Sequence, residues 1–321
     1  MYTVVITGIT GKSGQRLLDR MNGDFQKFSD YKFKLLCRTG EKSKNVKGRE
    51  SLDKALREKK LNIELVETDL DNAESIKRAF GEKVDMLFHV AGIRFTKNLV
   101  PIALECGVDN IVMVHTTGIY SKYKAAGEGY RQIEKEIQEL VEGYRQKGRE
   151  IAITTLRPTM IYGDLNDKNV SKFIKMVDKY RLFPTINGAR YELQPVWCND
   201  LGDAYFAVMT NWQVAKNKEY ILSGGKPIEL RDMFKEIAKQ LGVKNKFISC
   251  PYPLAYFGAW VVFIFSFTII DYREKVQRMV EPRAYPHDLA KTELGYNPAE
   301  FKEGVKEEII AYKERKQAKK V

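Results

Sequence analysis

The sequence predicts an α/β protein, built on a Rossmann-type doubly wound parallel sheet with a smaller, interleaved C-terminal α/β domain. In the first half, short β-rich runs alternate with helix-like stretches, which is typical of a parallel sheet covered by helices. A glycine-rich turn directly follows the first of these runs. The 321 residues, 44% of them hydrophobic, suffice for one large domain or for two unequal domains that share a core.

Six strands are predicted in the first half, at 4–7, 33–37, 62–68, 84–90, 110–116 and 151–157. Between them we expect helices at 15–22, from about 71, around 96–105 and over about 126–146, and a polar, lysine-rich stretch to about Lys60. The segment DNAESIKRAF begins with a capping residue and places Ile76 and Phe80 on one helix face. Right-handed crossovers between such strands would build the doubly wound sheet.

The second half is less regular. Helices are expected at 169–180, 201–210, 229–241 and 302–316, with strands near 191–196 and 219–224. No repeat or low-complexity linker separates the halves, so we expect them to interlock. The predicted division is a dinucleotide-binding domain at 1–163 and a capping region at 164–321, in which about 194–213 packs back on the first domain.

The composition favours a soluble protein with an anionic ligand. The formal net charge is +12, partly because the tail after Tyr312 reads KERKQAKKV. This excess suits an anionic small molecule, although net charge specifies no partner. Basic residues are scattered among acidic ones, and no recognition helix or aromatic RNA-binding motif is present, so nucleic acid is not an expected partner.

The cysteines and histidines form no recognisable metal-binding pattern. The four cysteines lie far apart without a C-x-x-C pair, and the three histidines show no ligand spacing. We therefore expect no metal, no disulfide framework and a cytoplasmic location. Met1 is followed at once by the strand-like run YTVVITG, so no signal peptide is expected.

One segment departs from the soluble pattern. The run 252–270, YPLAYFGAWVVFIFSFTII, contains no charged residue and reaches the length at which a membrane-spanning helix must be considered. Pro253 and Gly258 near its start argue against a span. A buried or surface-docked helix is favoured, and peripheral membrane contact through 252–270 stays open, as does a homodimer.

The glycine turn predicts a dinucleotide site. TGITGKSG places Gly8, Gly11 and Gly14 between the first strand and the first helix. Such glycines permit a tight turn, close approach to a pyrophosphate and close packing of the helix, while the helix N-terminus faces the phosphates. The spacing G-x-x-G-x-x-G differs by one from the usual dehydrogenase spacing. The expected cofactor contacts in this turn are Gly8, Thr10, Gly11, Lys12, Ser13 and Gly14.

Arg38 favours NADP over NAD. An NAD site usually has an acidic residue after the second strand to accept a hydrogen bond from the ribose 2′-hydroxyl. Arg38 stands there instead and can clamp a 2′-phosphate, with Lys42 and Lys44 close in sequence. The alternative interpretation is a surface arginine without a role.

The ends of the third and fourth strands supply further expected contacts. Asp69 and Leu70 follow the third strand, where the adenine edge would lie, and Ala91 and Gly92 follow the fourth, where small residues let the strand end lie against the cofactor. Parallel sheets of this type bind ligands at the carboxyl ends of their strands.

Taken together, these motifs resemble the short-chain dehydrogenase/reductase superfamily, in particular its extended and atypical branches with the NAD-dependent epimerase/dehydratases. TGITGKSG resembles the glycine motif, HVAG the fourth-strand signature, HTTGIYS the hydroxyl-rich fifth strand and LRPTMIYG the segment near nicotinamide and substrate. QPVWCNDLGDA and DLAKTELGYNP resemble later landmarks. The resemblance covers nearly the whole chain.

The resemblance implies a catalytic tyrosine with a lysine four residues later, plus a serine or threonine. Here Tyr130 is followed at that spacing by Glu134, and Lys135 lies about 100° further round the helix. A helix bulge could bring Lys135 to Tyr130, or Lys135 could keep only a cofactor role with Arg131 in the tyrosine position. Thr116 and Thr117 both remain candidates for the hydroxyl.

The resemblance also places Pro158 and Thr159 on the nicotinamide side, and Arg190 could bind a substrate phosphate. It implies an NADP-dependent oxidoreductase or epimerase/dehydratase-like enzyme that acts on a carbonyl or nucleotide-sugar substrate. The shifted tyrosine–lysine spacing keeps an alternative open, a non-catalytic NADP sensor of the atypical type. The sequence does not name the substrate.

Overall fold

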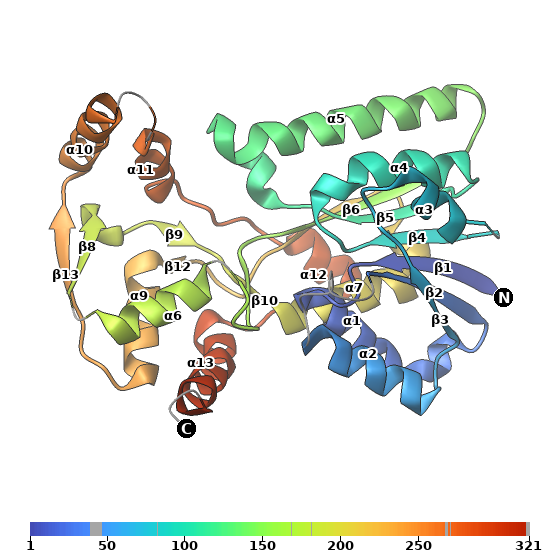
Figure 1. Cartoon of the computed structure of the whole chain (residues 1–321), viewed down its shortest axis with the longest axis horizontal. Coiled ribbons are helices and arrows are strands. Elements are labelled where there is room, and N and C mark those ends of the chain that lie inside the picture. Colours follow the sequence, from blue (N-terminus) through green and yellow to red (C-terminus); the bar gives the residue numbers. More distant parts are fainter. Residues whose placement is uncertain are drawn as a thin grey trace.

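The computed structural model describes residues 1–38, 47–81, 83–167, 169–180, 182–266, 269 and 271–318. Two lobes are joined by crossing segments near the middle of the molecule (Figure 1). The larger lobe contains the N-terminus and the main sheet. The smaller lobe is built mostly from the second half of the chain. Lys42 and Lys44, which the sequence places near Arg38, lie outside the described residues.

The main sheet has seven parallel strands in the order β11-β6-β5-β4-β1-β2-β3. The strands are β1 (Tyr2–Thr7), β2 (Tyr31–Cys37), β3 (Ile63–Glu67), β4 (Met86–His89), β5 (Asn110–Val114), β6 (Ala152–Pro158) and β11 (Glu219–Leu222). The chain builds the sheet from β1 to β3 in one direction and then returns to place β4 on the other side of β1, which makes the sheet doubly wound. The predicted fold class is confirmed, and the strand expected near 219–224 is the sheet's seventh.

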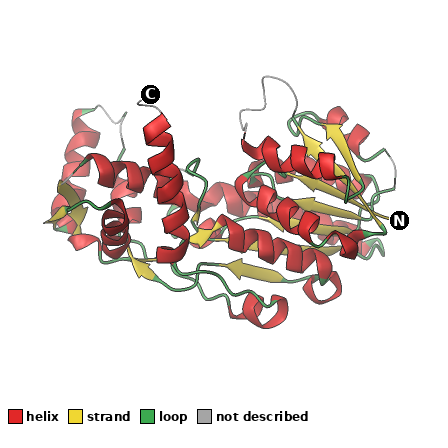
Figure 2. Cartoon of the chain, turned by 90° about the horizontal axis from the view of Figure 1, so that it is seen from below, coloured by secondary structure: helices red, strands yellow, loops and turns green. Residues whose placement is uncertain are grey.

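Helices cover both faces of this sheet (Figure 2). On one face lie α1 (Lys12–Gly23), α2 (Lys47–Glu58) and α7 (Cys198–Thr210); on the other lie α3 (Ala73–Ala79), α4 (Thr96–Glu105) and α5 (Lys124–Gln146). Alternate residues of β1 point to opposite faces, so Val4 and Ile6 join the first core and Val5 the second. Ile76 and Phe80 are both buried in the second core, as their spacing predicts.

The second half of the chain passes between the lobes. α7 packs against α1, and α12 (Asp288–Leu294) packs near α7 and β11. The close approach of α7 needs a glycine, because a Cβ on Gly202 would lie 2.4 Å from the Cβ of Arg16. The division at residue 163 stays a prediction.

The smaller lobe has its own apolar core. Its helices are α6 (Val170–Lys179), α9 (Leu230–Leu241) and α13 (Phe301–Ala318), and its short strands are β7 (Ile161–Tyr162), β8 (Leu182–Ile186), β9 (Glu192–Leu193), β10 (Val196–Trp197), β12 (Ile228–Glu229) and β13 (Lys246–Cys250). Phe234 stacks on Phe183 and Phe247 in this core.

Several elements differ from the expectations. The polar stretch before Lys60 contains α2, and the strand expected near 191–196 is divided into β9 and β10 around Pro195, which has no N–H to donate to a ladder. Within the run 252–270, residues Tyr252–Phe265 form α10, and α11 (Arg273–Met279) comes later in the chain. Within the described part of the chain, no helix combines the length and apolar character needed to cross a bilayer.

Candidate functional site

The glycine turn lies between β1 and α1, at the carboxyl edge of the sheet. Gly8 has φ of +74°, and a Cβ there would lie 2.5 Å from the backbone nitrogen of Ala91. A Cβ on Gly14 would lie 2.2 Å from the carbonyl oxygen of Gly8. Both positions therefore need glycine for backbone reasons, because any side chain would strike main-chain atoms of the turn or of the neighbouring strand end.

The N-terminus of α1 is suited to an anion. Gly11 is its N-cap and supplies no side chain to satisfy the first N–H groups of the helix. Those groups and the positive end of the helix dipole favour a phosphate at this position. Ser13 is buried in the first turn, and the carbonyl of Thr10 accepts a hydrogen bond from Gln15 at 3.1 Å. Lys12 forms an ion pair with Asp164 at 3.5 Å.

Ala91 and Gly92 close the other side of this turn. The N–H of Ala91 donates to the hydroxyl of Thr7 at 3.3 Å, which ties the end of β4 to the end of β1. A Cβ added to Gly92 would meet no atom within 4 Å, so this position borders open space. The turn, the helix N-terminus and this open edge fit a dinucleotide pyrophosphate.

A cavity of about 500 Å³ lies at the ends of β2 and β3. It is lined by Arg38, Glu67, Thr68, Asp69, Asn72, Ser75 and Arg78. Arg38 is exposed, and Arg78 reaches the cavity from α3, so guanidinium groups from two elements border it. Leu70 differs from its neighbour Asp69 because its side chain packs on the second core and its carbonyl accepts a hydrogen bond from Asn98 at 3.1 Å.

A second cavity, of about 430 Å³, lies where the two lobes meet. From the larger lobe it is lined by Lys12, Thr116, Thr117, Gly118, Ser121, Tyr130 and Thr159. The hydroxyl of Thr116 accepts a hydrogen bond from the N–H of Gly118 at 3.0 Å, and Thr117 donates to the carbonyl of Pro158 at 3.4 Å. We call this space the central cavity.

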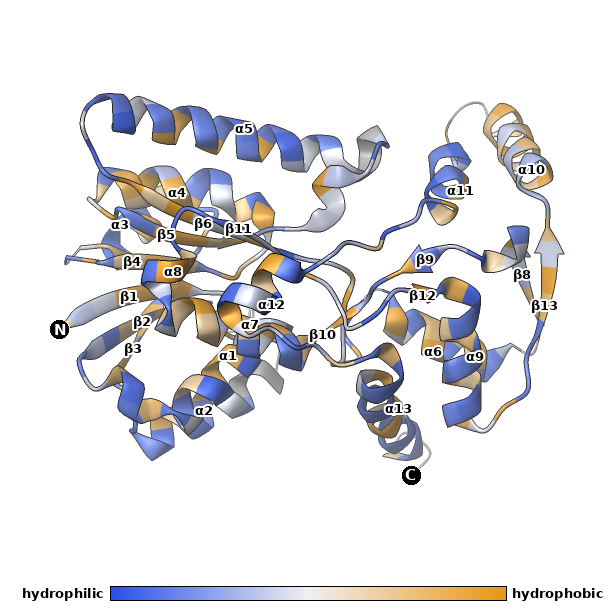
Figure 3. Ribbon diagram, turned by 180° about the vertical axis from the view of Figure 1, so that it is seen from behind, coloured by the Kyte–Doolittle hydropathy of each residue, from blue (hydrophilic) through white to orange (hydrophobic). Residues whose placement is uncertain are grey.

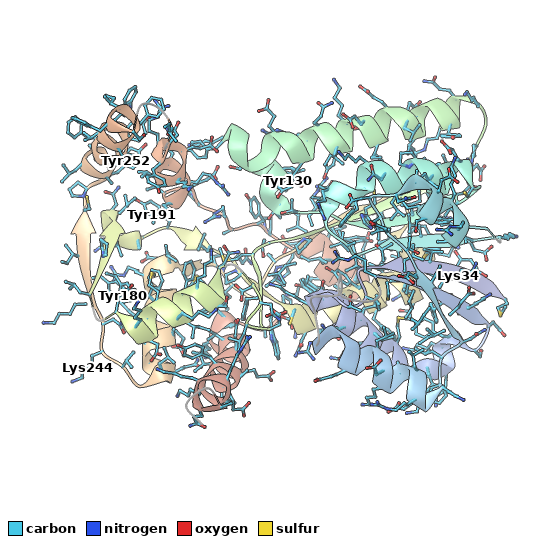
Figure 4. The ribbon with its side chains drawn as sticks, in the orientation of Figure 1. Lys34, Tyr130, Tyr180, Tyr191, Lys244 and Tyr252 are labelled. Carbon is cyan, nitrogen blue, oxygen red and sulfur yellow. The ribbon has the colours of Figure 1, made fainter. Side chains whose placement is uncertain are left out.

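Tyr130 lies in the N-terminal part of α5 and borders the central cavity (Figure 4). A Cβ on Gly118 would lie 3.3 Å both from the Cε2 atom of Tyr130 and from the hydroxyl oxygen of Thr116. The structure therefore brings together three of the residues expected from sequence, Thr116, Thr117 and Tyr130.

Contrary to expectation, the structure does not bring Lys135 to this group. α5 runs without a break from Lys124 to Gln146, so no bulge turns Lys135 toward Tyr130. The side chain of Lys135 is 69% exposed, and its Nζ lies 3.8 Å from a carboxylate oxygen of Glu139. It borders a separate hollow between the second half of α5 and β6. Arg131 is also engaged elsewhere, donating to the carbonyls of Ile119 and Ser121.

Glu134 takes the place one turn after Tyr130. Its carboxylate accepts hydrogen bonds from Arg157 at 2.6 and 2.8 Å and lies 2.7 Å from Nδ1 of His115. Arg157 also donates to Glu219 at 2.7 Å. Burial alone would raise the pKa of Glu134, but His115 and Arg157 hold it at about 2. A fixed carboxylate therefore stands where the related enzymes are expected to have a lysine.

The smaller lobe adds residues that the sequence analysis missed. Arg278, Glu281, Arg283 and Tyr285 line the central cavity from the opposite side. Burial, followed by the charge of Arg278, lowers the pKa of Arg283. Among the described residues, the buried Nε atoms of both arginines have no hydrogen-bond partner. The only sequence feature that pointed to this group is the position of Arg283, just before the DLAKTELGYNP segment.

Two other candidate positions, Arg190 and Thr159, differ in where they lie. Arg190 does not reach the central cavity but lines a hollow in the smaller lobe with Arg231 and Lys235. Thr159, which follows β6 and lines the central cavity, donates its hydroxyl hydrogen to the carbonyl of Gln194, between β9 and β10. No group of three or more histidine, cysteine or acidic side chains in the described ranges is arranged to hold a metal ion.

Comparison with known proteins gives relatives of the same architecture. Over 285 residues the chain is 22% identical to N-acetyl-alpha-D-glucosaminyl-diphospho-ditrans,octacis-undecaprenol 4-epimerase of Escherichia coli O157:H7, covering 82% of this chain and 80% of the relative. A UDP-glucose 4-epimerase from Thermotoga maritima, solved with UDP-glucose, superposes with a TM-score of 0.69 at 16% identity, covering 98% of this chain and 99% of the other.

A dTDP-glucose 4,6-dehydratase from Streptomyces venezuelae, solved with NAD, superposes with a TM-score of 0.66 at 15% identity over 97% of each chain. At these identities the solved structures show the fold alone. The model of the NAD dependent epimerase/dehydratase family matches residues 4–222, which is more than half of the sequence. The glycine turn, the hydroxyl-bearing strand end at Thr116 and the LRPTMIYG segment all fall within this match, and the chain therefore belongs to the NAD dependent epimerase/dehydratase family.

Proposed function

We propose that this protein is an NADP-dependent oxidoreductase of the epimerase/dehydratase type that acts on a sugar diphosphate. One observation carries the proposal. The central cavity joins hydroxyl groups from the cofactor-binding lobe, on Thr116, Thr117 and Tyr130, to two arginines from the smaller lobe. A carbonyl or alcohol carbon and an anionic tail of one molecule could be held there at the same time.

The preference for NADP is supported by the cavity at Arg38. Two guanidinium groups border it, and guanidinium binds phosphate through paired N–H donors. Glu67 and Asp69 also line this cavity, so acidic groups that could accept a bond from a ribose hydroxyl are present on the β3 side. The cofactor supplies or accepts hydride when bound.

The diphosphate is supported by Arg278 and Arg283. A buried N–H without an acceptor costs free energy, and the buried Nε–H groups of these two half-buried arginines lie on one side of the same cavity, where an anion could accept from them. By their names, two relatives act on or bind diphosphate-linked sugars, one carried on undecaprenol and one on uridine. The shared chemistry is a glycosyl diphosphate, which is the substrate class proposed for this chain.

Tyr130 is the residue proposed to transfer a proton to the oxygen of the reacting carbonyl. Its hydroxyl would donate to the oxygen that receives negative charge during carbonyl reduction, with a hydroxyl of Thr116 or Thr117 as the second hydrogen-bond partner. The carboxylate of Glu134, engaged with His115 and Arg157, offers no positive charge to stabilise a tyrosinate. The tyrosinate that this proton transfer leaves on Tyr130 would therefore have no stabilising cation at the lysine position.

A second function is supported by the same carboxylate. Because Glu134 is fixed in an ion network at the lysine position, the fold could keep NADP binding and lose turnover, as a sensor that controls another protein. Tight NADPH binding without turnover on any sugar diphosphate, together with a protein that co-purifies, would favour this second function.

The test is a turnover assay on the full chain. NADPH is supplied with 4-keto sugars on UDP, on dTDP and on a polyprenyl diphosphate, and nicotinamide absorbance is followed. C4 epimerisation of the corresponding alcohols is followed by chromatography. We expect turnover with one of the three carriers. The Tyr130→Phe variant should lose this turnover, and the Arg283→Ala variant should bind the substrate much more weakly. Full turnover by Tyr130→Phe on its identified substrate would contradict the proposal.

A further inference from the structure

Helix α10 exposes apolar side chains to solvent, unlike an ordinary surface helix. A surface helix normally presents polar residues to solvent. α10 contains no charged residue, and its only buried residue is Ala259. The exposed side chains are large and apolar: Leu254 is 60% exposed, Phe257 65%, Ile264 59% and Phe265 79%. The helix projects from the end of the smaller lobe and is coloured largely as hydrophobic (Figure 3).

The exposed residues cover most of the helix circumference. At 100° per residue they span an arc of about 200°. The opposite arc faces the protein and holds the other half-buried or buried residues, whereas the half-buried Val261 lies within the exposed arc. The outward set is Pro253, Leu254, Phe257, Gly258, Trp260, Val262, Ile264 and Phe265. The inward set is Tyr252, Ala255, Tyr256, Ala259, Phe263 and Ser266. Tyr252, at the start of the helix, is labelled in Figure 4.

Basic and aromatic residues follow α10 in the chain, and one of them contacts it. The guanidinium of Arg273, on α11, lies 4.6 Å from the ring centre of Trp260 and 3.8 Å from that of Phe263. The ammonium of Lys275 lies 4.7 Å from the ring centre of Tyr272. α11 carries three cations against one glutamate, in a chain whose net charge is +12, and of these Arg273 also pairs with the carboxylate of Asp271 at 2.8 Å. Aromatic side chains with cations beside them are typical of helices that lie at a membrane surface.

We propose that α10 docks this protein on the surface of an anionic lipid bilayer, lying in the plane of the interface. Its 14 residues measure about 21 Å, which is shorter than the roughly 30 Å hydrocarbon core, so the helix can lie on a bilayer but cannot cross it. A protein groove buries one stripe of a helix, whereas lipid can cover an arc of about 200°. The breadth of the exposed arc therefore favours lipid over a protein partner.

Docking would also place the central cavity near the lipid. α11 follows α10 and carries Arg278, which lines the central cavity. A sugar diphosphate carried on a lipid would thus be supplied at the surface to which α10 binds. This consequence rests on the proposed function, whereas vesicle binding is measured without turnover, so failure of either one can be distinguished.

The experiment is co-sedimentation of the full chain with phosphatidylcholine vesicles, with and without phosphatidylglycerol. We expect the wild type to sediment with the anionic vesicles and to be released by salt. The double variant Phe257→Glu/Ile264→Glu should lose binding by roughly tenfold or more. The matched control, Val214→Glu/Ile310→Glu, changes two equally apolar exposed helix residues away from α10 and should bind like the wild type. Circular dichroism establishes that both variants are folded.

A second readout uses Trp260. Its emission should shift to the blue on addition of anionic vesicles and be quenched by brominated lipid, and Trp260→Phe should remove this response while Trp197 and Trp212 remain. Equal vesicle binding by the Phe257→Glu/Ile264→Glu variant and the wild type would overturn the proposal. So would a wild type that ignores vesicles and forms a dimer that this variant dissociates, since the occupant of α10 would then be a second copy.

Discussion

At the residue scale, Arg38 tests the preferred cofactor. It is exposed at the end of β2 and shares its cavity with Arg78. A charge-assisted hydrogen bond contributes about 1.5–3 kcal/mol, so Arg38→Ala should weaken NADPH binding by roughly 10- to 100-fold and leave NADH binding nearly unchanged. Calorimetric titration with both dinucleotides measures this difference. Arg315→Ala, on the exposed end of α13, is the control and should change neither affinity. Equal weakening of NADPH and NADH would show that Arg38 does not contact the 2′-phosphate.

A substitution at Glu134 tests how much the ion network at the lysine position contributes to the free energy of unfolding. Glu134→Lys restores the spacing of the related enzymes, but it leaves Arg157 beside a second cation, and the Arg157 side chain is only 5% exposed. Breaking a buried ion pair costs about 3–5 kcal/mol, so the free energy of unfolding should fall by this amount in urea denaturation. Glu139→Lys, exposed on the same helix, should change it by less than about 1 kcal/mol. A Glu134→Lys protein as stable as the wild type would mean that the ion network has no structural role.

At the scale of elements, the contact between α1 and α7 joins the two halves of the chain. A Cβ on Gly202 would lie 2.7 Å from the backbone carbon of Arg16, so Gly202→Ala must push the two helices apart. Overpacking of this kind costs roughly 1–3 kcal/mol. The same change at Gly143, on α5, meets no atom within 4 Å and should stabilise by up to about 1 kcal/mol through helix propensity. Thermal unfolding of both variants measures the contrast, and equal melting temperatures would contradict this account of the contact.

The elements also show what local sequence can predict. The six strands of the first half and the glycine turn follow from apolar runs and turn residues, which act over a few neighbouring positions. β8 and β13 were not predicted, because each is stabilised mainly by pairing with a partner more than sixty residues away. Glu134 was recognised only as a break in a spacing. Its role depends on Arg157 and His115, which come from strand ends that only the folded sheet brings beside α5.

At the scale of the whole molecule, a few polar contacts tie the two lobes together around the central cavity. Lys12 in the glycine turn pairs with Asp164, and Glu308 on α13 accepts a hydrogen bond from the N–H of Leu165 at 3.1 Å. Asp167, which is adjacent to Glu308, also lines the central cavity. The segment 164–167 between the lobes is therefore held by one residue from the cofactor turn and by one from the C-terminal helix.

Glu308 makes this connection dependent on pH. Burial, followed by the neighbouring Asp167, raises the pKa of Glu308 to about 9, so the folded protein keeps its proton at neutral pH, while an unfolded chain would release it above pH 4.5. The unfolded state then binds fewer protons, and the stability that the protonated Glu308 provides falls as pH rises between these two values. The loss is about 1.4 kcal/mol for each pH unit crossed.

Glu308→Gln should remove this dependence. The amide keeps an oxygen for the N–H of Leu165 and provides an N–H donor toward Asp167, and it does not titrate. The variant and the wild type should have similar unfolding free energies near pH 4.5, and the variant should become the more stable of the two as pH approaches 8. Urea denaturation at several pH values measures the two curves, with Glu314→Gln on the exposed end of the same helix as control. Parallel curves for Glu308→Gln and the wild type would show that Glu308 is already ionised in the folded protein, and the connection between α13 and the inter-lobe segment would then have to be held by a charged carboxylate.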